Sequence, residues 1–390
     1  MPRLMIDGTA LSPHAKGVGK YSLHLINQLS ARLPQDWTID VLALKGQPMG
    51  DQLHSRASVL PVPAHSELAK GFFLLPRMAH RMKADIILLP MESATAPLRA
   101  PTVTILHDIT RLIDDAAGGE RNLARKSLDA MKMFFRRGTL RRSFAVICNS
   151  EFTAQEAHAR YAIPLEKIHV GYCGIDSRFY EDDYLRPEHL WPQLGVWSGY
   201  VLTFATGDPR ERFDLVPEVW ASVHDALPRV GLVVAGVSNA SAYCETLKKK
   251  FTSAGMEIGR DVLFVPFLSE TEFPALRSLY RCADFYLELS GHEGFGMQLA
   301  EAMAVGTTCI SSGRGALHEV AGGYAVEFSD MTTNLIADTI ISSYAAELQN
   351  RDNSKQVDFT RRYSWGDVGA VATLQLLALA LHGSSTETFR

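Results

Sequence analysis

The sequence predicts an α/β protein with two Rossmann-like domains that face each other across a cleft. Short apolar runs alternate with helical stretches in two separate series along the chain. Such alternation is typical of parallel sheets that helices cover on both faces. The 390 residues are also long for a single core, so two domains are the better expectation.

The first series defines an N-terminal domain over residues 1–180. The segment at 19–33 has the spacing of an amphipathic helix and follows the first expected strand. The apolar runs that we expect to form buried strands are 3–7, 38–44, 86–90, 102–106 and 145–149.

The second series defines a C-terminal domain over residues 200–360. Between the two domains, residues 181–199 are rich in acids, Pro, Trp and Gly without a clear period, and we expect an interdomain linker there. A ligand would then bind where the two sheets present the carboxyl ends of their strands. The expected strands of this domain are 200–205, 231–236, 262–265, 285–289 and 308–311.

Composition excludes several classes of protein. With 46% hydrophobic and 21% charged residues the chain reads as an ordinary globular protein, and its net charge of −4 predicts no nucleic-acid partner. The five cysteines are scattered without metal-ligand spacing, which predicts a reducing compartment and no disulfide framework or metal site. No apolar run resembles a signal peptide or approaches the ~18–20 residues of a membrane span, so we expect a cytoplasmic protein.

The most informative stretch is a glycine-rich turn at 290–306, which follows the expected strand at 285–289. Glu293 and Glu301 lie eight positions apart on either side of this turn, and Gly294 and Gly296 lie within it. Glycines let a ligand approach the backbone, and the N-terminus of the next helix offers N–H groups to an anion. One carboxylate on each side of an anion site suits a nucleotide sugar, in which a diphosphate separates two sets of hydroxyls. The alternative is a plain turn with two solvated glutamates.

This stretch resembles the glutamate-x7-glutamate motif of glycosyltransferase family 4, whose members are retaining enzymes of the GT-B fold. Other motifs extend the resemblance over residues 4–380, including the Gly-Val-Gly-Lys-Tyr string at 17–21 and the Leu-His-Asp-Ile-Thr string at 106–110. The resemblance implies transfer of a sugar from a nucleoside-diphosphate sugar to a hydroxyl acceptor, such as a glycan or a lipid-linked sugar. UDP-glucose is the default donor and GDP-mannose the next. The resemblance also implies that a helix at 365–382 packs back on the first domain.

The resemblance further assigns roles to individual residues. Glu293 would hold hydroxyls of the donor sugar and Glu301 those of the ribose, while His107 would contact the sugar near the reacting carbon with Asp108 beside it. Fixed positive groups would neutralise the diphosphate, so no metal or cofactor is expected. The other residues expected to bind the donor are Gly17, Gly19, Pro266, Phe267, Gly294, Phe295, Gly296 and Met297.

The chain departs from the family pattern after the first strand of the second domain. Family members carry an Arg and a Lys there that grip the diphosphate, but no Arg precedes Asp208, and Glu211 occupies the Lys position. We therefore expect Arg212, with Arg210 as the next candidate, to supply the positive charge.

Two other classes of function stay open. A non-catalytic homologue that binds a nucleotide sugar is suggested by Glu211. A dinucleotide-dependent oxidoreductase is suggested by the Gly17-x-Gly19 pattern, but Ser22 stands where that fold has a third glycine.

A basic stretch at 121–142 contains eight Lys or Arg and one acid, with apolar residues interspersed. Such a helix suits an anionic membrane surface or a lipid-linked acceptor, which would place the protein at the inner membrane face. The alternative is an ordinary solvated surface helix.

Overall fold

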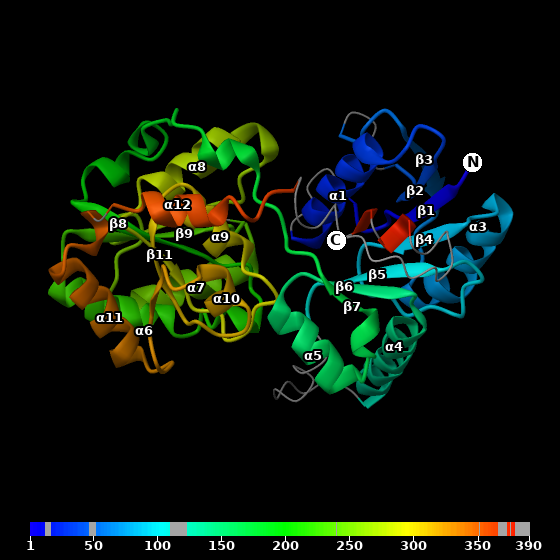
Figure 1. The fold of residues 1–390 in the computed structure, drawn as a ribbon. Coiled ribbons are helices and arrows are strands. Elements are labelled where there is room, and N and C mark those ends of the chain that lie inside the picture. The colour runs from blue at the N-terminus through cyan, green and yellow to red at the C-terminus, as the bar shows by residue number, and fades with distance from the viewer. Residues whose placement is uncertain are drawn as a thin grey trace. The chain divides into compact units, whose positions relative to one another are not determined.

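The computed structural model describes residues 1–11, 17–46, 52–109, 123–238, 240–350, 352–365, 373–374 and 376–378. The chain divides into two units, one formed by Met1–Gly174 with Tyr363–Arg390 and the other by Ile175–Arg362. Each unit contains a parallel sheet flanked by helices (Figure 1). The α/β class with two parallel-sheet domains is thereby confirmed.

The sheet of the first unit has the strand order β3-β2-β1-β4-β5-β6-β7, and all neighbouring strands are parallel. Its strands are β1 (Arg3–Asp7), β2 (Thr38–Leu44), β3 (Ala57–Val62), β4 (Ile86–Leu89), β5 (Thr102–Leu106), β6 (Ala145–Cys148) and β7 (Ile168–Val170). A π-helical turn at Lys70–Leu74 joins two of its helices. The helices are α1 (Val18–Arg32), α2 (Glu67–Ala69), α3 (Leu75–Met82), α4 (Leu123–Arg142) and α5 (Glu151–Tyr161).

The sheet of the second unit has the order β10-β9-β8-β11-β12-β13 and is also parallel. Its strands are β8 (Gly199–Phe204), β9 (Val230–Ala235), β10 (Val262–Val265), β11 (Phe285–Glu288), β12 (Thr308–Ser311) and β13 (Val326–Glu327). Helices α6 and α11 lie side by side on the sheet (Figure 1). The helices are α6 (Val216–Ala226), α7 (Ala242–Ser253), α8 (Phe273–Arg281), α9 (Met297–Ala304), α10 (Leu317–Ala321), α11 (Thr333–Ala345) and α12 (Ser354–Thr360).

The expected strands are confirmed to within one residue at either end. These strands form because their runs of Val, Ile, Leu and aromatic residues bury both faces of a parallel sheet. In β9, for example, every residue is buried, and Trp220 from α6 and Phe251 from α7 belong to the same core.

Strands β3, β7 and β13 were not expected from the sequence, and each of them lies at an edge of its sheet. These three strands are short or exposed, and they lack a continuous run of buried apolar residues. Strand β3 exposes Val59 and contains Pro61, a residue that is tolerated mainly at sheet edges.

The segment at 181–199 is not a free linker, because it is bonded to the second unit. The buried guanidinium of Arg277, on α8, lies 2.7 Å from Glu181 and 2.6 Å from Asp183. Nearby, Ser278 Oγ accepts a hydrogen bond of 2.9 Å from the Leu185 backbone N–H. A buried arginine needs carboxylate partners, so this acidic run is a structural part of the second unit, which begins at Ile175.

The strand order places a topological switch point in each sheet. In the first sheet the chain runs outward in opposite directions from β1 and β4, and in the second from β8 and β11. Ligands of open α/β sheets bind outside the carboxyl ends of the strands at such points. The loops that follow these strands are therefore the expected positions of a ligand-binding site.

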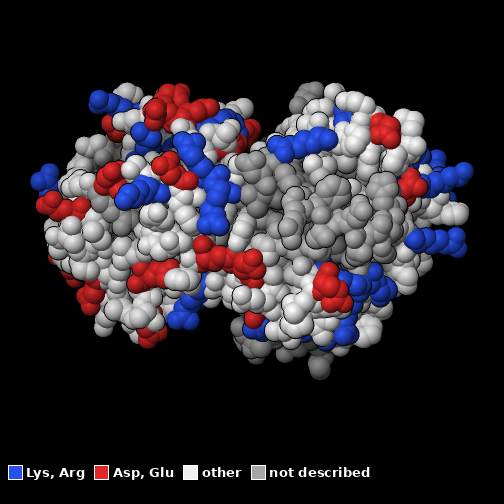
Figure 2. Space-filling view, viewed as in Figure 1, with Lys and Arg blue, Asp and Glu red and all other residues white. Residues whose placement is uncertain are grey.

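Acidic and basic side chains are interspersed over the described part of the face in Figure 2. This face accordingly shows no broad field of one sign among the residues that the structure describes. Within the same residues, no helix is both long enough and apolar enough to cross a membrane.

Candidate active site

The glycine-rich turn connects β11 to α9 at the switch point of the second sheet. Phe295 is only 2% exposed and anchors the turn, while Gly296 precedes the helix with φ at +90°. A Cβ at Gly296 would lie 2.5 Å from Cδ2 of Leu317, so this position requires glycine for both conformation and space. No side chain caps α9, whose first residue is Met297, and its N-terminus therefore suits an anion.

The two glutamates of the motif lie on either side of this helix start. Glu293 belongs to the turn and is partly exposed. Glu301 lies on α9, is 7% exposed, and accepts a hydrogen bond of 3.0 Å from the hydroxyl of Tyr280. Burial, and then the nearby Glu301 charge, raise the pKa of Tyr280 well above its usual value, so the tyrosine remains a donor to this carboxylate. The pairing fixes the orientation of Glu301.

A second loop, between β12 and α10, packs against the backbone of Glu293. The Ala316 N–H donates a hydrogen bond of 2.9 Å to the carbonyl of Glu293. Gly315 has φ at +66°, and a Cβ there would lie 2.6 Å from the Glu293 carbonyl oxygen. This loop was not expected from the sequence. The two glycines of its Gly-Arg-Gly string at 313–315, between a strand and a helix, were the available signal.

The arginine-bearing loop after β8 packs against the glycine-rich turn. The neighbouring strands β8 and β11 are parallel, so the loops at their carboxyl ends lie side by side. Gly291 N–H donates a hydrogen bond of 2.8 Å to the Arg210 carbonyl, and a Cβ at Gly291 would lie 3.6 Å from Cγ of Arg212. The structure thus brings Arg212 next to the turn that carries Glu293.

The two candidate arginines differ in their partners. Arg210 forms a two-pronged ion pair with Asp208, at 2.9 Å through Nε and 2.6 Å through its terminal nitrogen. Arg212 has a positive φ of 48°, and its ion pair among the described residues is a longer one, with its Nε 3.4 Å from Oδ1 of the exposed Asp214. More of the positive charge of Arg212 is therefore left for a ligand.

Glu211, which replaces the expected basic residue, bonds to its own loop. Its carboxylate accepts a 2.8 Å hydrogen bond from the Thr206 backbone N–H and a second from the Thr206 hydroxyl. Burial raises the pKa of Glu211, in spite of these hydrogen bonds, and the neighbouring Glu288 and Asp208 add to the rise. The Glu211 side chain therefore stabilises the conformation of the loop at 206–213, which carries Arg212.

Pro266 and Phe267 follow β10 at the same edge of the sheet. Both are exposed, and the Phe267 side chain is 40% accessible despite its apolar character. These two residues therefore form an apolar surface at the carboxyl end of β10, the end of the strands at which parallel sheets generally bind ligands.

His107 and Asp108 follow β5 in the first unit. The Nε2 atom of His107 lies 2.7 Å from the carbonyl of Pro90, and since a carbonyl only accepts, this nitrogen carries the proton. The His107 ring is 8% exposed. Its centroid lies 4.5 Å from the centroid of the Tyr21 ring, in an edge-to-face arrangement. Trp365, near the C-terminus, packs on the same Tyr21 at 5.2 Å. His107 is thus held in a fixed tautomer and orientation.

The other expected features of the first unit are placed as follows. Gly17 precedes α1 with φ at +47°, a conformation that favours glycine, and Gly19 is buried in its first turn. Trp365 also stacks on His24 and contacts Gly174. Most of the expected helix at 365–382 lies outside the described residues.

Several arginines of α4 bind within the protein. Arg136 pairs with Glu67, and Arg137, Arg141 and Arg142 donate to backbone carbonyls. The exposed apolar side chains of this helix include Phe134 at 73%, Met131 at 41% and Leu128 at 40%. The helix thus combines structural arginines with an exposed apolar stripe. Residues 121 and 122 of the basic stretch lie outside the described part of the chain.

Among the described residues, no cluster of His, Cys, Asp or Glu has the arrangement of a metal site. In the acidic run at 181–183, Glu181 and Asp183 bind Arg277.

Two family models match the chain, one on each part of the fold. Glycosyltransferase Family 4 matches residues 15–179, and Glycosyl transferases group 1 matches residues 198–342. The fold and these matches identify a GT-B glycosyltransferase. More closely, the chain belongs to glycosyltransferase family 4.

Individual relatives agree with this assignment. The chain is 28% identical over 183 residues to D-inositol 3-phosphate glycosyltransferase of Jonesia denitrificans, covering 45% of this chain and 42% of that protein. It is 27% identical over 189 residues to alpha-monoglucosyldiacylglycerol synthase of Streptococcus pneumoniae, covering 47% of this chain and 41% of that protein. The matches thus span less than half of these curated relatives.

Solved structures show the same fold at low identity. Sucrose-phosphate synthase from Thermosynechococcus elongatus superposes with a TM-score of 0.72 at 18% identity, covering 98% of this chain and 100% of that chain. Anabaena HepE in complex with UDP and glucose superposes with a TM-score of 0.70 at 18% identity, covering 97% of this chain and 100% of that chain.

Proposed function

We propose that this protein is a retaining hexosyltransferase that moves a sugar from a nucleoside-diphosphate sugar to a hydroxyl acceptor in polysaccharide or glycolipid assembly. The observation that carries the proposal is the position of Arg212 beside Gly291, in the turn that carries Glu293 and leads to the uncapped start of α9. Carboxylates, an anion site and a cation are the groups that a sugar, a diphosphate and a ribose require.

The chemical step would depend on electrostatic stabilisation. As the bond to the diphosphate breaks, positive charge grows on the sugar ring and negative charge on the leaving group. The N-terminus of α9 and Arg212 would stabilise the diphosphate, so no metal is required in this proposal. Glu293 would hold the sugar hydroxyls and Glu301 the ribose hydroxyls, with Pro266 and Phe267 receiving the base. His107 would contact the sugar from the first unit.

UDP-glucose is the first donor to test, and GDP-mannose the second. The fold neighbour HepE was solved with UDP-glucose, which supports this order of testing but does not identify the donor of this chain.

A non-catalytic homologue is the second candidate, because Glu211 stands at a position where the family carries Lys. The hydrogen bonds from Thr206 favour an active enzyme over a non-catalytic homologue, because they direct the Glu211 carboxylate into its own loop. A carboxylate held this way opposes a diphosphate less than one that faces the ligand.

Peripheral contact with the inner membrane face is a further part of the proposal. The stripe of Leu128, Met131 and Phe134 on α4 supports it, because exposed apolar residues beside basic ones suit a lipid surface. A lipid-linked acceptor would then meet the first unit.

Donor hydrolysis by the purified protein tests the proposed function. UDP-, GDP- and ADP-sugars are offered with a chelator present, and release of the nucleoside diphosphate is measured. We expect slow release from one donor and its loss in Glu293→Ala. Nucleotide binding without any release would favour the non-catalytic homologue instead.

A further inference from the structure

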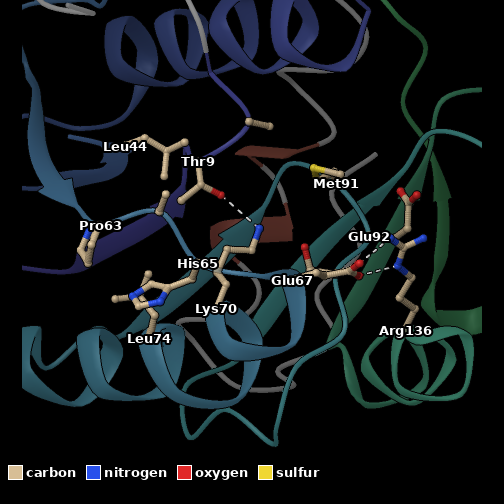
Figure 3. Close-up of a pocket in the computed structure, with 13 residues that line it drawn as sticks. Thr9, Leu44, Pro63, His65, Glu67, Lys70, Leu74, Met91, Glu92 and Arg136 are labelled. Atoms are coloured by element: carbon tan, nitrogen blue, oxygen red, sulfur yellow. Dashed lines mark hydrogen bonds and ion pairs between the residues drawn. The ribbon is translucent and has the colours of Figure 1, made fainter. Parts of the chain in front are cut away.

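A cavity of about 270 Å³ lies within the first unit, and its lining includes the Glu67–Arg136 pair (Figure 3). Thr9 and Ala10 follow β1, and residues 91–93 follow β4, so the cavity opens at the switch point of the first sheet. Its volume is just below the ~300–1,000 Å³ of pockets for drug-sized ligands, which suits a single sugar ring. The remaining lining residues are Leu44, Pro63, Ala64, His65, Glu67, Lys70, Leu74 and Arg136.

Both cations of this cavity are already paired with carboxylates. Lys70 Nζ lies 2.8 Å from Asp7 Oδ2 and 3.0 Å from Thr9 Oγ1. Arg136 binds Glu67 with both prongs, at 2.6 Å through Nε and 2.8 Å through its terminal nitrogen (Figure 3). These pairs are largely buried, with side-chain exposures of 13% and 2% for the first and 16% and 18% for the second.

A second carboxylate acts on the same guanidinium. Burial would lower the pKa of Arg136, but the hydrogen bonds and charge of Glu67, followed by the charge of Glu92, raise it. Burial would likewise raise the pKa of Glu67, but Arg136 and the Ala94 N–H outweigh it and lower this pKa. The carboxylate and the guanidinium thus stay charged and held to each other at neutral pH.

The formal charges of the Lys, Arg and Glu side chains that line the cavity therefore sum to zero. Lys70 and Arg136 balance Glu67 and Glu92, and Asp7 behind Lys70 adds a further negative charge. A phosphate would have to displace a carboxylate from a partly buried ion pair, which is costly. A hydroxyl both donates and accepts, so it can bind beside these pairs without breaking them. The apolar side chains of Leu44, Pro63, Leu74 and Met91 offer contacts for the C–H groups of a sugar.

We propose that this cavity is the acceptor subsite and that the Glu67–Arg136 pair restricts it to uncharged sugars, excluding phosphorylated ones. The assignment as an acceptor subsite rests on the proposed glycosyltransferase activity. Glu67 is then the residue that determines specificity, because it occupies the guanidinium that would otherwise bind a phosphate.

Ligand binding to the full chain without a donor tests the proposal. The probes are methyl α-glucoside, methyl α-mannoside and the 6-phosphates of glucose and mannose, followed by saturation-transfer NMR. We expect the methyl glycosides to bind the wild type at least about tenfold more tightly than the phosphates. In Ala64→Trp, which adds bulk to a residue that lines the cavity, glycoside binding is expected to disappear.

The decisive variant is Glu67→Gln, which removes the negative charge paired with Arg136 while keeping the shape of the side chain. A charge-assisted hydrogen bond to phosphate is worth ~1.5–3 kcal/mol, so phosphate binding should tighten about tenfold or more. Glu156→Gln is the matched control, because it frees Arg160 from an ion pair on α5 outside the cavity. We expect the control to leave phosphate binding unchanged.

Equal binding of phosphates and glycosides to the wild type would overturn the proposal, as would no gain in Glu67→Gln or the absence of any glycoside binding. The wild-type comparison stands even if Glu67→Gln does not fold. Because no donor is present, failure here with intact donor hydrolysis would reject only the acceptor subsite. Glycoside binding without any donor hydrolysis would reject the proposed transfer reaction.

Discussion

The backbone of Glu293 is the part of the site that a distant substitution should disturb most. In Gly315→Ala the new Cβ would lie 2.6 Å from the Glu293 carbonyl oxygen and 2.7 Å from its nitrogen. Ordinary contact begins at 3.4 Å, so the turn would have to shift by about 0.8 Å. A misplacement of ~1 Å can reduce the rate by about 100-fold. We therefore expect donor hydrolysis to fall at least about tenfold without any change to a ligand-binding side chain.

Gly323→Ala is the matched control for this substitution. Gly323 also has a positive φ, of 82°, but no atom lies within 4 Å of the added Cβ. Both variants should lose ~1–2 kcal/mol of stability from the left-handed conformation, as measured by urea unfolding. Donor hydrolysis by the folded protein should fall in Gly315→Ala and stay at the wild-type rate in Gly323→Ala. Equal activities of two folded variants would refute the assignment of Glu293 to the donor site.

Other predictions concern charge and surface. Arg212→Ala should lower donor hydrolysis about 100-fold, the cost of losing one stabilising donor, while Arg210→Ala, already paired with Asp208, should lower it less; the reverse order would assign the charge to Arg210. Because the pKa of Glu211 is raised, the free energy of unfolding of Glu211→Gln should increase relative to the wild type as pH rises from ~4 through the folded pKa. The pKa of Glu67 is lowered, so the free energy of unfolding of Glu67→Gln should fall relative to the wild type as pH rises from the folded pKa of Glu67 to ~4, and curves parallel to the wild type would contradict both signs. Phe134→Ser should weaken binding to phosphatidylglycerol vesicles about tenfold if this ring enters the lipid, and unchanged binding would remove the membrane proposal.

The central strands were predictable because burial on both faces demands a continuous apolar run. The edge strands β3, β7 and β13 were not, since their hydrogen bonds depend on a neighbouring strand rather than on their own pattern, whereas the edge strand β10 has an apolar run and was predicted. Strand β13, with the two residues Val326–Glu327, pairs with β12 without an apolar run of its own. The acidic run at 181–183 was interpreted as a linker feature for a similar reason, because its partner Arg277 lies far along the chain.

The candidate site was predictable where its residues form one local motif, as in the turn from Glu293 to Glu301. Its supporting contacts join residues that are distant in sequence, and no periodicity reveals them. Gly291 meets the Arg210 carbonyl, and Gly315 meets Glu293, only because the strands that carry these loops are neighbours in the sheet. The same limit applies to the Glu67–Arg136 pair, whose residues come from separate helices.

Hydrogen–deuterium exchange with UDP, GDP or ADP tests most directly whether the nucleotide binds at the turn between β11 and α9. The account predicts that one of these nucleotides slows exchange of the backbone amides at 290–304 and in the neighbouring loop at 206–213. Protection confined to other segments, or none with any nucleotide at saturating concentration, would contradict the placement of the donor at this turn.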